Sequence, residues 1–336
     1  MNDMILFRCD ANATLGLGHL QRCCTLAAEI VKQGGQCIMM GPELSYFTKE
    51  FNEIFTQWIP RRFDSDLQDV SCVIKVADSN QVKKIVLDDY RITDAYQLSL
   101  QAKGMHWLQF DGTGKKKIWA DLLVNAMPIA SQEMYSGKVF NPLTHFLLGP
   151  SYALVRPEFR LGLSTKKKNV QANRGFVFAG GGDDKGALKI LIQSLYEILD
   201  LTVVTTVHNP GLSELQKWIT SQKYTRVQLH INPDNISALM QSCDLAFISA
   251  GTVTYEINCL GLPMVLFSIA DNQIEHARAW SEKTGARYLG DHRDLTANSI
   301  QEAAVDVIKF PQKPMKRLVD GLGSQRVAEA LMELTV

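Results

Sequence analysis

Residues 8–22, RCDANATLGLGHLQR, decide the fold of this chain. Residues 4–7 before them form a short apolar run that is typical of a buried strand. After them apolar residues recur at helical spacing from Leu20 to Val31, and Gly34-Gly35 ends that helix. The stretch is therefore a strand, a glycine-bearing turn and a helix start. Such a turn directs backbone N–H groups and a partial positive charge at a ligand above the strand end.

The composition is that of a globular protein with two domains. A chain of 336 residues is longer than one hydrophobic core usually supports, and 46% of its residues are hydrophobic. The 35 basic and 35 acidic residues cancel, so we expect no nucleic-acid and no membrane partner. No apolar run approaches the roughly 20 residues that span a bilayer, and the early first strand leaves no room for a signal peptide. Seven cysteines without a C-x-x-C pair indicate a cytoplasmic protein without disulfides or a zinc site.

Strand and helix patterns alternate in both halves of the chain, which is typical of parallel sheets with helices on both faces. This alternation is lost over residues 131–159, where prolines and glycines gather. The predicted strands are 4–7, 36–40, 84–87, 106–110, 122–124, 176–179, 202–207, 227–231, 245–248 and 264–269. The predicted helices include 20–31, a stretch up to about 55, 64–82, 93–103, 187–199 and 324–334.

We therefore predict an α/β protein of the GT-B fold, in which two Rossmann-like, doubly wound domains face a cleft. The first domain is 1–150, a linker region follows over 151–173, and the second domain is 174–322. A helix within 323–336 packs back across the junction. Dehydrogenases also have two domains, but neither glycine-rich turn matches G-x-G-x-x-G followed by an acidic residue, and a P-loop G-K-[ST] is absent.

The first candidate site lies at the strand ends of the first domain. His19 follows two glycines at a helix N-terminus, which disfavours the protonated ring and suits a neutral base. Asp10, across the same loop, is expected to orient His19. Tyr90 follows a neighbouring strand together with Asp88 and is expected to hold a water or a sugar oxygen. Because a lone histidine is more often structural, this assignment depends on the turn that carries it.

The second candidate site is a strand-to-helix passage in the second domain, built from small residues that let a diphosphate approach the backbone. Glu256, one turn into that helix, can accept both hydroxyls of a ribose. The passage consists of Ser249, Ala250, Gly251 and Thr252.

Two further loops are expected to complete the second site. Asn272 and Gln273 follow the next strand, and their side-chain amides suit the neutral hydroxyl or amide groups of a sugar. The glycine-rich loop with Gly180, Gly181 and Asp183 is expected to form a third wall. Helix capping by residues of these loops is the structural alternative.

Taken together, these motifs resemble the UDP-2,4-diacetamido-2,4,6-trideoxy-β-L-altropyranose hydrolases of pseudaminic acid biosynthesis (the PseG family). The resemblance covers residues 5–288, and a more distant one is to the GT-B transferase that attaches N-acetylglucosamine in peptidoglycan synthesis. Position 182 departs from the family, because glycine stands where threonine or serine is frequent. The motifs are R-x-D-x5-G-x-G-H-x-x-R over 8–22, Asp88-x-Tyr90, GPSYALVR over 149–156, Gly180-Gly181-x-Asp183, Ser249-Ala250-Gly251 with Glu256, and Asn272-Gln273.

The resemblance implies a metal-free hydrolase of the EC 3.6.1 type. It would use no cofactor, cleave the anomeric C–O bond of a UDP-linked diacetamido-trideoxy sugar with inversion, and release UDP and the free sugar. The family's catalytic histidine falls on His19 and its active-site tyrosine on Tyr90, while Glu256 matches the residue that contacts the nucleotide. Further substrate contacts are implied at Gly16, Gly18, Arg22, Asp88, Tyr152, Asn272 and Gln273.

Other functions remain open from the sequence. The main alternative is a GT-B glycosyltransferase that uses the same UDP-sugar and replaces water by an alcohol. A UDP-sugar 2-epimerase would need a second acid/base set, and a non-catalytic nucleotide-sugar binder would leave His19 without a role. For the hydrolase we expect a monomer whose partner is the small-molecule UDP-sugar.

Overall fold

A computed structural model describes residues 3–11, 17–43, 51–161, 173–309 and 315–335 of the protein. It divides into two compact units. The first is Met1–Leu154 with Leu322–Val336, and the second is Val155–Gly321. The last segment of the chain therefore belongs to the first unit.

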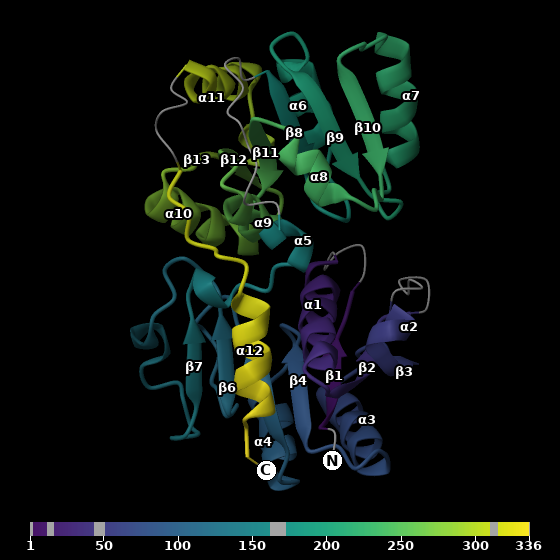
Figure 1. Ribbon diagram of the computed structural model, residues 1–336, viewed down its shortest axis with the longest axis vertical. Helices are drawn as coiled ribbons and strands as arrows, with labels where there is room; N and C mark the ends of the chain where they lie inside the picture. The colour runs from purple at the N-terminus through teal and green to yellow at the C-terminus, as the bar shows by residue number, and fades with distance from the viewer. Residues whose placement is uncertain (1–2, 12–16, 44–50, 162–172, 310–314, 336) are drawn as a thin grey trace. The chain divides into compact units, whose positions relative to one another are not determined.

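The first unit is built on a sheet of seven parallel strands in the order β3-β2-β1-β4-β5-β6-β7 (Figure 1). The chain starts in the middle with β1, runs to one edge, and then continues on the other side of β1 with β4. This is a doubly wound arrangement. The strands are β1 Met4–Cys9, β2 Gln36–Gly41, β3 Phe55–Pro60, β4 Lys84–Asp88, β5 His106–Phe110, β6 Leu122–Asn125 and β7 His145–Leu148.

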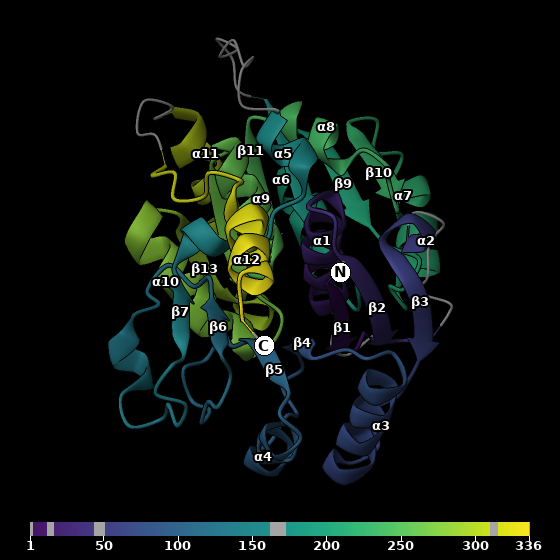
Figure 2. The same cartoon turned by 60° about the horizontal axis from the view of Figure 1, so that its bottom comes forward.

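Helices cover both faces of this sheet, so neighbouring residues of one strand are buried on opposite sides. Ile5 and Phe7 of β1 lie in the core that includes Leu20 of α1 and Val327 of α12, whereas Leu6 lies in the other core. The C-terminal α12 lies against α1 and β6, from which it is far apart in sequence (Figure 2). The helices are α1 Gly18–Lys32, α2 Phe51–Ile54, α3 Asp66–Ser79, α4 Asp94–Ala102, η2 Gln132–Tyr135, η3 Pro150–Tyr152 and α12 Gly323–Met332.

The second unit repeats this plan with six parallel strands in the order β10-β9-β8-β11-β12-β13. Its core joins the sheet to α6 and α11, with buried residues such as Val177, Leu191 and Ile300. The strands are β8 Arg174–Phe178, β9 Asp200–Thr205, β10 Val227–Ile231, β11 Leu245–Ser249, β12 Met264–Ser268 and β13 Arg287–Asp291. The helices are α5 Pro157–Leu161, α6 Ala187–Leu195, α7 Leu212–Gln222, α8 Ile236–Gln241, α9 Val253–Leu260, α10 Asn272–Thr284, η5 His292–Asp294 and α11 Ala297–Lys309.

Three edge strands and part of the expected linker differ from the sequence prediction. The strands β3, β7 and β13 were not predicted, although β7 lies within the stretch where the alternation is lost. All three are sheet edges with few fully buried residues, which weakens their hydrophobic pattern. The expected linker over 151–173 is partly folded, because Phe159 of α5 is fully buried and α5 packs against α9. Residues 162–172 of that linker lie outside the described residues.

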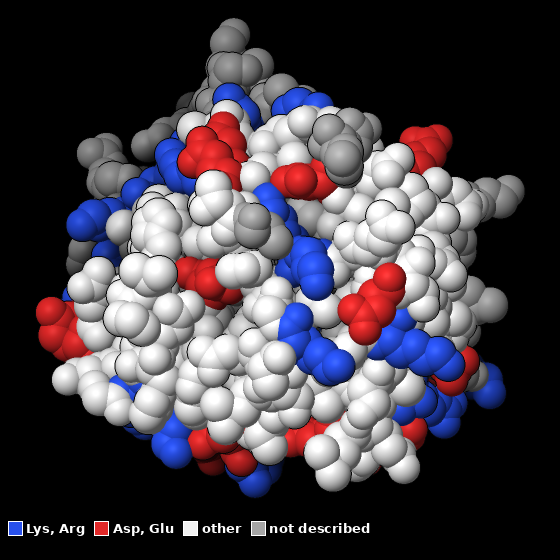
Figure 3. All heavy atoms as spheres, turned by 90° about the horizontal axis from the view of Figure 1, so that it is seen from below, with Lys and Arg blue, Asp and Glu red and all other residues white. Residues whose placement is uncertain are grey.

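The surface carries both signs of charge. On the face shown in Figure 3, basic and acidic side chains are spread among one another rather than separated by sign. No helix in the described part of the chain is both long and apolar enough to cross a membrane.

Candidate functional site

The first group of candidate residues lies where the strand order of the first sheet reverses. β1 and β4 are adjacent and parallel, and Cys9 at the end of β1 pairs with Asp88 at the end of β4. The chain leaves these two strands toward opposite edges of the sheet. Ligands of doubly wound proteins bind at such a point, beyond the carboxyl ends of the strands. His19, in the first turn of α1, is placed there by the loop that follows β1.

His19 is held by a buried carboxylate. The His19 side chain is only 8% exposed, and its Nδ1 lies 2.6 Å from Oδ1 of Asp88. Arg22 donates from Nε and Nη2 to the same carboxylate, and its Nη2 also lies 3.0 Å from His19 Nδ1. An ionised carboxylate can only accept, and its contact with Nδ1 is the shorter one, so we assign the proton to Nδ1. The lone pair of Nε2 is then available for a proton.

The Asp88 carboxylate is shared by His19 and Arg22. It is 1% exposed, and its two oxygens accept from His19 and Arg22. Burial alone would raise the pKa of Asp88, but the positive charge of Arg22 and the contact with His19 hold it well below its usual range. A contact between Asp88 and the substrate, as expected from the sequence, remains a prediction, and in the structure its oxygens accept from His19 and Arg22. The side chain of Arg22, also expected at the substrate, is tied to Asp88 and lies over the ring of Phe110 at 4.9 Å.

Tyr90 lies beside the histidine ring. The two ring centroids are 4.7 Å apart and the rings are nearly perpendicular at 88°, which is a favourable edge-to-face geometry. Tyr90 is 40% exposed, so its hydroxyl can meet a ligand. Lys116 fixes this loop by donating to the carbonyl oxygens of Tyr90 at 2.6 Å and Ile92 at 3.3 Å. No sequence motif indicated Lys116.

Asp10 does not have the predicted role of orienting His19. Its Oδ2 accepts from Arg91 at 2.6 Å and its Oδ1 from the backbone N–H of Ala11 at 2.8 Å. Arg91 also donates to Asp89, so Asp10 belongs to an ion-pair group with Arg91 and Asp89. The carboxylate that orients His19 comes from β4 instead.

The remaining predicted residues of the first unit are less informative. Gly16 lies outside the described residues. Gly18 is the first residue of α1. Tyr152 of η3 is partly buried and packs against the hydrophobic core, so part of its ring has a structural function.

The second group of candidate residues lies where the order of the second sheet reverses, between β8 and β11. Gly180, after β8, has a left-handed φ of +100°. A Cβ at this glycine would lie 3.6 Å from Oγ of Ser249 and 3.6 Å from Cδ1 of Ile269. The ends of β8, β11 and β12 therefore meet at this glycine. The sequence predicted that the loops at these three strand ends would form the walls of one site. Gly181 accepts from the hydroxyl of Thr206 at 2.7 Å through its carbonyl oxygen.

The passage from β11 into α9 is fixed by its backbone. The N–H of Ala250 donates to Phe267 at 2.9 Å, and its carbonyl oxygen contacts Nδ1 of His276 at 3.0 Å. Gly251 and Thr252 follow directly, and Thr252 is the exposed N-cap residue of α9. This passage offers small residues and a helix N-terminus to an anion, the arrangement expected for a diphosphate.

The two residues of the predicted amide pair, Asn272 and Gln273, lie in different surroundings. Gln273 accepts from the N–H of Ile269 at 2.9 Å through Oε1, which turns its Nε2 toward Gly251, where a Cβ would lie 3.8 Å away. Asn272 is exposed at the first position of α10. Asp183 is exposed and accepts from the N–H of Lys185 at 2.9 Å, which forms a local turn.

Glu256 forms an ion pair with Arg156, a residue 100 positions away in the sequence. Its side chain is 13% exposed, and Oε1 lies 3.1 Å from Nε of Arg156. Burial raises the pKa of Glu256, and the positive charge of Arg156 opposes this shift. A ribose at Glu256 would therefore share the carboxylate with Arg156.

His276 is a partly buried histidine for which the sequence indicated no function. Its Nδ1 donates to the carbonyl oxygen of Ala250, while Nε2 accepts from Nε1 of Trp280 at 3.0 Å and contacts the hydroxyl of Tyr255 at 3.1 Å. Both ring nitrogens are used in the neutral form. Burial lowers the pKa of His276 to about 4, although the bond to Ala250 opposes this shift.

This neutral histidine makes stability depend on pH. Below the ordinary pKa of 6.5, His276 is protonated in the unfolded chain. In the folded chain its pKa is about 4, so it remains neutral down to about that pH. We therefore expect the wild-type free energy of unfolding to fall between pH 6.5 and pH 4, with up to about 3 kcal/mol from this group. In His276→Gln, which keeps a donor and an acceptor, urea unfolding should show a smaller fall. His145→Gln, at an exposed histidine of β7, is the control, and an unchanged fall in His276→Gln would contradict the prediction.

The chain is similar in sequence to three curated proteins. No protein-family model matches the chain. It is 26% identical over 288 residues to the UDP-2,4-diacetamido-2,4,6-trideoxy-beta-L-altropyranose hydrolase of Campylobacter jejuni, which covers 84% of this chain and 97% of that protein. It is 22% identical over 234 residues to the spore coat polysaccharide biosynthesis protein SpsG of Bacillus subtilis, covering 66% of this chain and 67% of that one. It is also 24% identical over 278 residues (76% of this chain) to the uncharacterized protein MJ1062 of Methanocaldococcus jannaschii, of which it spans only about half, 54%.

Solved structures share the fold over nearly the whole chain. MurG of Acinetobacter baumannii has a TM-score of 0.67 at 13% identity and covers 99% of this chain, with 100% of its own chain matched. The UDP-GlcNAc 2-epimerase of Neisseria meningitidis, bound to UDP-GlcNAc, has a TM-score of 0.68 with the same identity and coverage. The predicted α/β fold of the GT-B type is therefore confirmed.

Proposed function

We propose that this protein is a UDP-sugar-processing enzyme that hydrolyses the anomeric C–O bond of a UDP-linked diacetamido-trideoxy sugar. The observation that carries the proposal is the contact between His19 Nδ1 and Asp88 at 2.6 Å, which leaves Nε2 as a base. The name of the Campylobacter jejuni relative supports hydrolysis and this class of sugar. The second candidate is transfer of the sugar to an alcohol, because the same base can activate either nucleophile.

In the proposed reaction, Nε2 of His19 takes a proton from water as the water oxygen bonds to C1 of the sugar. The bond between C1 and the phosphate oxygen breaks on the opposite face, and its electron pair leaves with UDP. The configuration at C1 is therefore inverted. UDP is a good leaving group and needs no strong acid. The reaction therefore requires a positioned base, which raises the rate by about 10²–10⁴-fold.

The second unit has a separate proposed function, which is to bind the nucleotide. The helix N-terminus at Thr252 and the Nε2 of Gln273 offer hydrogen-bond donors to a diphosphate, and donors placed in advance also stabilise charge that grows during bond cleavage. Glu256 is proposed to accept from the ribose. Among the described residues no group of three or more His, Cys, Asp or Glu side chains is placed to hold a metal ion.

Hydrolysis in ¹⁸O-labelled water tests the proposal. We expect UDP to be released from a UDP-diacetamido-trideoxy sugar in the presence of EDTA and without an added acceptor. Mass spectrometry should find the label in the free sugar, because water attacks C1. Label in the phosphate product would contradict attack at C1. Turnover only after addition of an alcohol would favour the transferase.

A further inference from the structure

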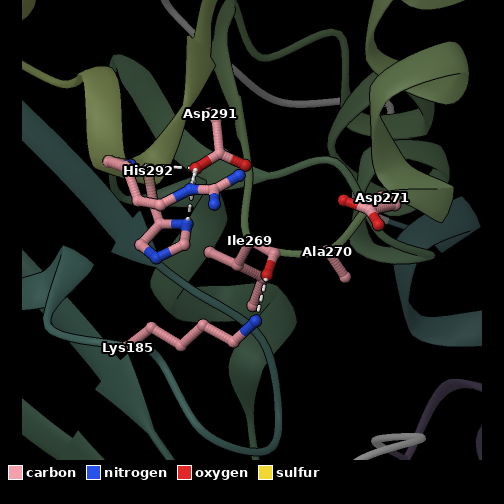
Figure 4. A pocket seen from close by; sticks show the side chains of 7 residues that line it. Lys185, Ile269, Ala270, Asp271, Asp291 and His292 are labelled. Atoms are coloured by element: carbon pink, nitrogen blue, oxygen red, sulfur yellow. Dashed lines mark hydrogen bonds and ion pairs between the residues drawn. The ribbon is translucent and has the colours of Figure 1, made fainter.

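The second unit contains a hollow of about 460 Å³ next to the loop that follows β12. Three loops at the carboxyl ends of strands form it, after β8, β12 and β13. Figure 4 shows the His292 imidazole and the Asp271 carboxylate on opposite sides, with Ile269 and Ala270 between them. Asp291 and Lys185 also line it. Its size lies within the range of small-molecule sites, roughly 300–1,000 Å³.

The hollow adjoins the loops of the candidate diphosphate site through Ile269. The side chain of Ile269 lies 3.6 Å from the position of a Cβ on Gly180, and its N–H donates to Gln273. Its carbonyl oxygen accepts from Nζ of Lys185 at 2.7 Å, which ties the β8 loop to the β12 loop. Lys185 itself has a left-handed φ of +51°, a conformation that a non-glycine residue keeps only where its surroundings fix it. A group attached to a diphosphate at Gly180 therefore has this hollow beside it.

His292 has hydrogen-bonding capacity that the protein does not use. Its Nδ1 lies 3.0 Å from Oδ1 of Asp291, but outside the geometry of a hydrogen bond, and among the described residues this buried nitrogen has no hydrogen-bond partner. The same oxygen of Asp291 accepts from Arg293 at 2.7 Å. A small rotation of the imidazole toward a ligand therefore breaks no hydrogen bond at Nδ1.

The charges around the hollow favour a neutral ligand. Lys185 and Arg293 balance Asp271 and Asp291, and the hydrogen bonds from Arg293 hold the pKa of Asp291 down to about 2. With these charges balanced, the hollow has no net charge that would attract a charged ligand. Hydroxyl and amide groups suit the site, because they donate to carboxylates and accept from an imidazole or ammonium group.

We propose that this hollow binds the N-acylated sugar of the sugar nucleotide, with His292 and Asp271 hydrogen-bonded to its amide and hydroxyl groups. The inference rests on the proposed function, because it takes the diphosphate to lie at Gly180 and the passage into α9. It adds the loop after β13, which none of the sequence motifs includes. His292 is thus a specificity residue for the sugar and has no part in binding UDP.

Calorimetric titration of the full chain with UDP-GlcNAc and with UDP tests this assignment. In His292→Ala we expect the affinity for UDP-GlcNAc to fall about 5- to 10-fold, the value of one hydrogen bond to a polar ligand, while the affinity for UDP stays unchanged. His145→Ala, at an exposed histidine of the first unit, should change neither value. Asp271→Asn, at an exposed position, gives the same readout if His292→Ala fails to fold.

The outcomes separate the two proposals. Equal losses for UDP and UDP-GlcNAc, or no loss for either, would overturn the assignment of the hollow and leave nucleotide binding intact. Wild-type protein that binds UDP-GlcNAc no more tightly than UDP would also overturn it. Wild-type protein that binds neither compound would instead contradict the proposed function.

Discussion

Replacing His19 by Asn is expected to lower kcat by about 10²–10⁴-fold, while the affinity for UDP stays within about twofold. Asn can still hydrogen-bond to Asp88 but cannot take a proton from water. Because His19 is assigned to the chemical step alone, KM should change much less than kcat. The measurement is UDP release from the sugar nucleotide at saturating substrate, combined with titration of UDP against the variant.

A second histidine of the same unit provides a matched control. His106 on β5 also contacts an aspartate, with 3.3 Å between its Nδ1 and Oδ1 of Asp121, and its side chain is 32% exposed. His106→Asn removes the same chemical groups from a position away from the strand-order reversal, so kcat should remain near the wild-type value. Near-normal turnover in His19→Asn would show that the base has been wrongly assigned. Equal losses in both variants would indicate a general loss of structure.

The fold could be predicted from local sequence because its central strands are buried on both faces. Residues such as Ile5, Leu6 and Phe7 of β1 are fully buried, and they form a continuous apolar run that ends in a glycine-bearing turn. Edge strands have no such requirement. In β13 every residue is only partly buried, so its sequence RYLGD carries no strong pattern.

The position of the candidate sites was also predictable, whereas the partners within them were not. His19 and Ser249 were expected at strand ends, and parallel sheets gather such residues at one edge. The carboxylate that contacts His19 is determined by the order of the strands. Because β4 pairs with β1, Asp88 at the end of β4 lies at the end of β1. The same holds for His276 of α10, which contacts Ala250, a residue 26 positions earlier in the passage before α9. Spacing along the chain contains no information about such pairs.

Asp88→Asn is expected to impair both stability and catalysis. The substitution leaves the guanidinium of Arg22 without its carboxylate in a largely buried site, which we expect to cost about 3 kcal/mol of unfolding free energy. The neutral amide can also donate to Nδ1 of His19, which would move the proton to Nε2 and remove the base. The folded variant should therefore lose about 10²–10⁴-fold in kcat, measured at a temperature where circular dichroism shows it to be folded.

The matched control is Asp69→Asn, which breaks another buried pair of the first unit. Asp69 and Arg8 are both fully buried, with 2.8 Å between Oδ1 and Nη2. This variant should lose comparable stability but retain kcat, because Asp69 has no contact with His19. If both variants lost kcat equally, Asp88 would have no specific function in orienting the histidine.

The pH dependence of the free energy of unfolding is a second test of Asp88. A residue that acted only in catalysis would not change it. Its pKa in the folded state lies below the ordinary 3.8, so its contribution is complete above about pH 4 and is lost as the pH falls further. The difference in unfolding free energy between wild type and Asp88→Asn should therefore be constant from pH 5 to 8 and narrow below about pH 4. Urea denaturation across this range measures it. A constant difference at every pH would mean that the carboxylate's charge contributes nothing to holding Arg22 and His19 in place.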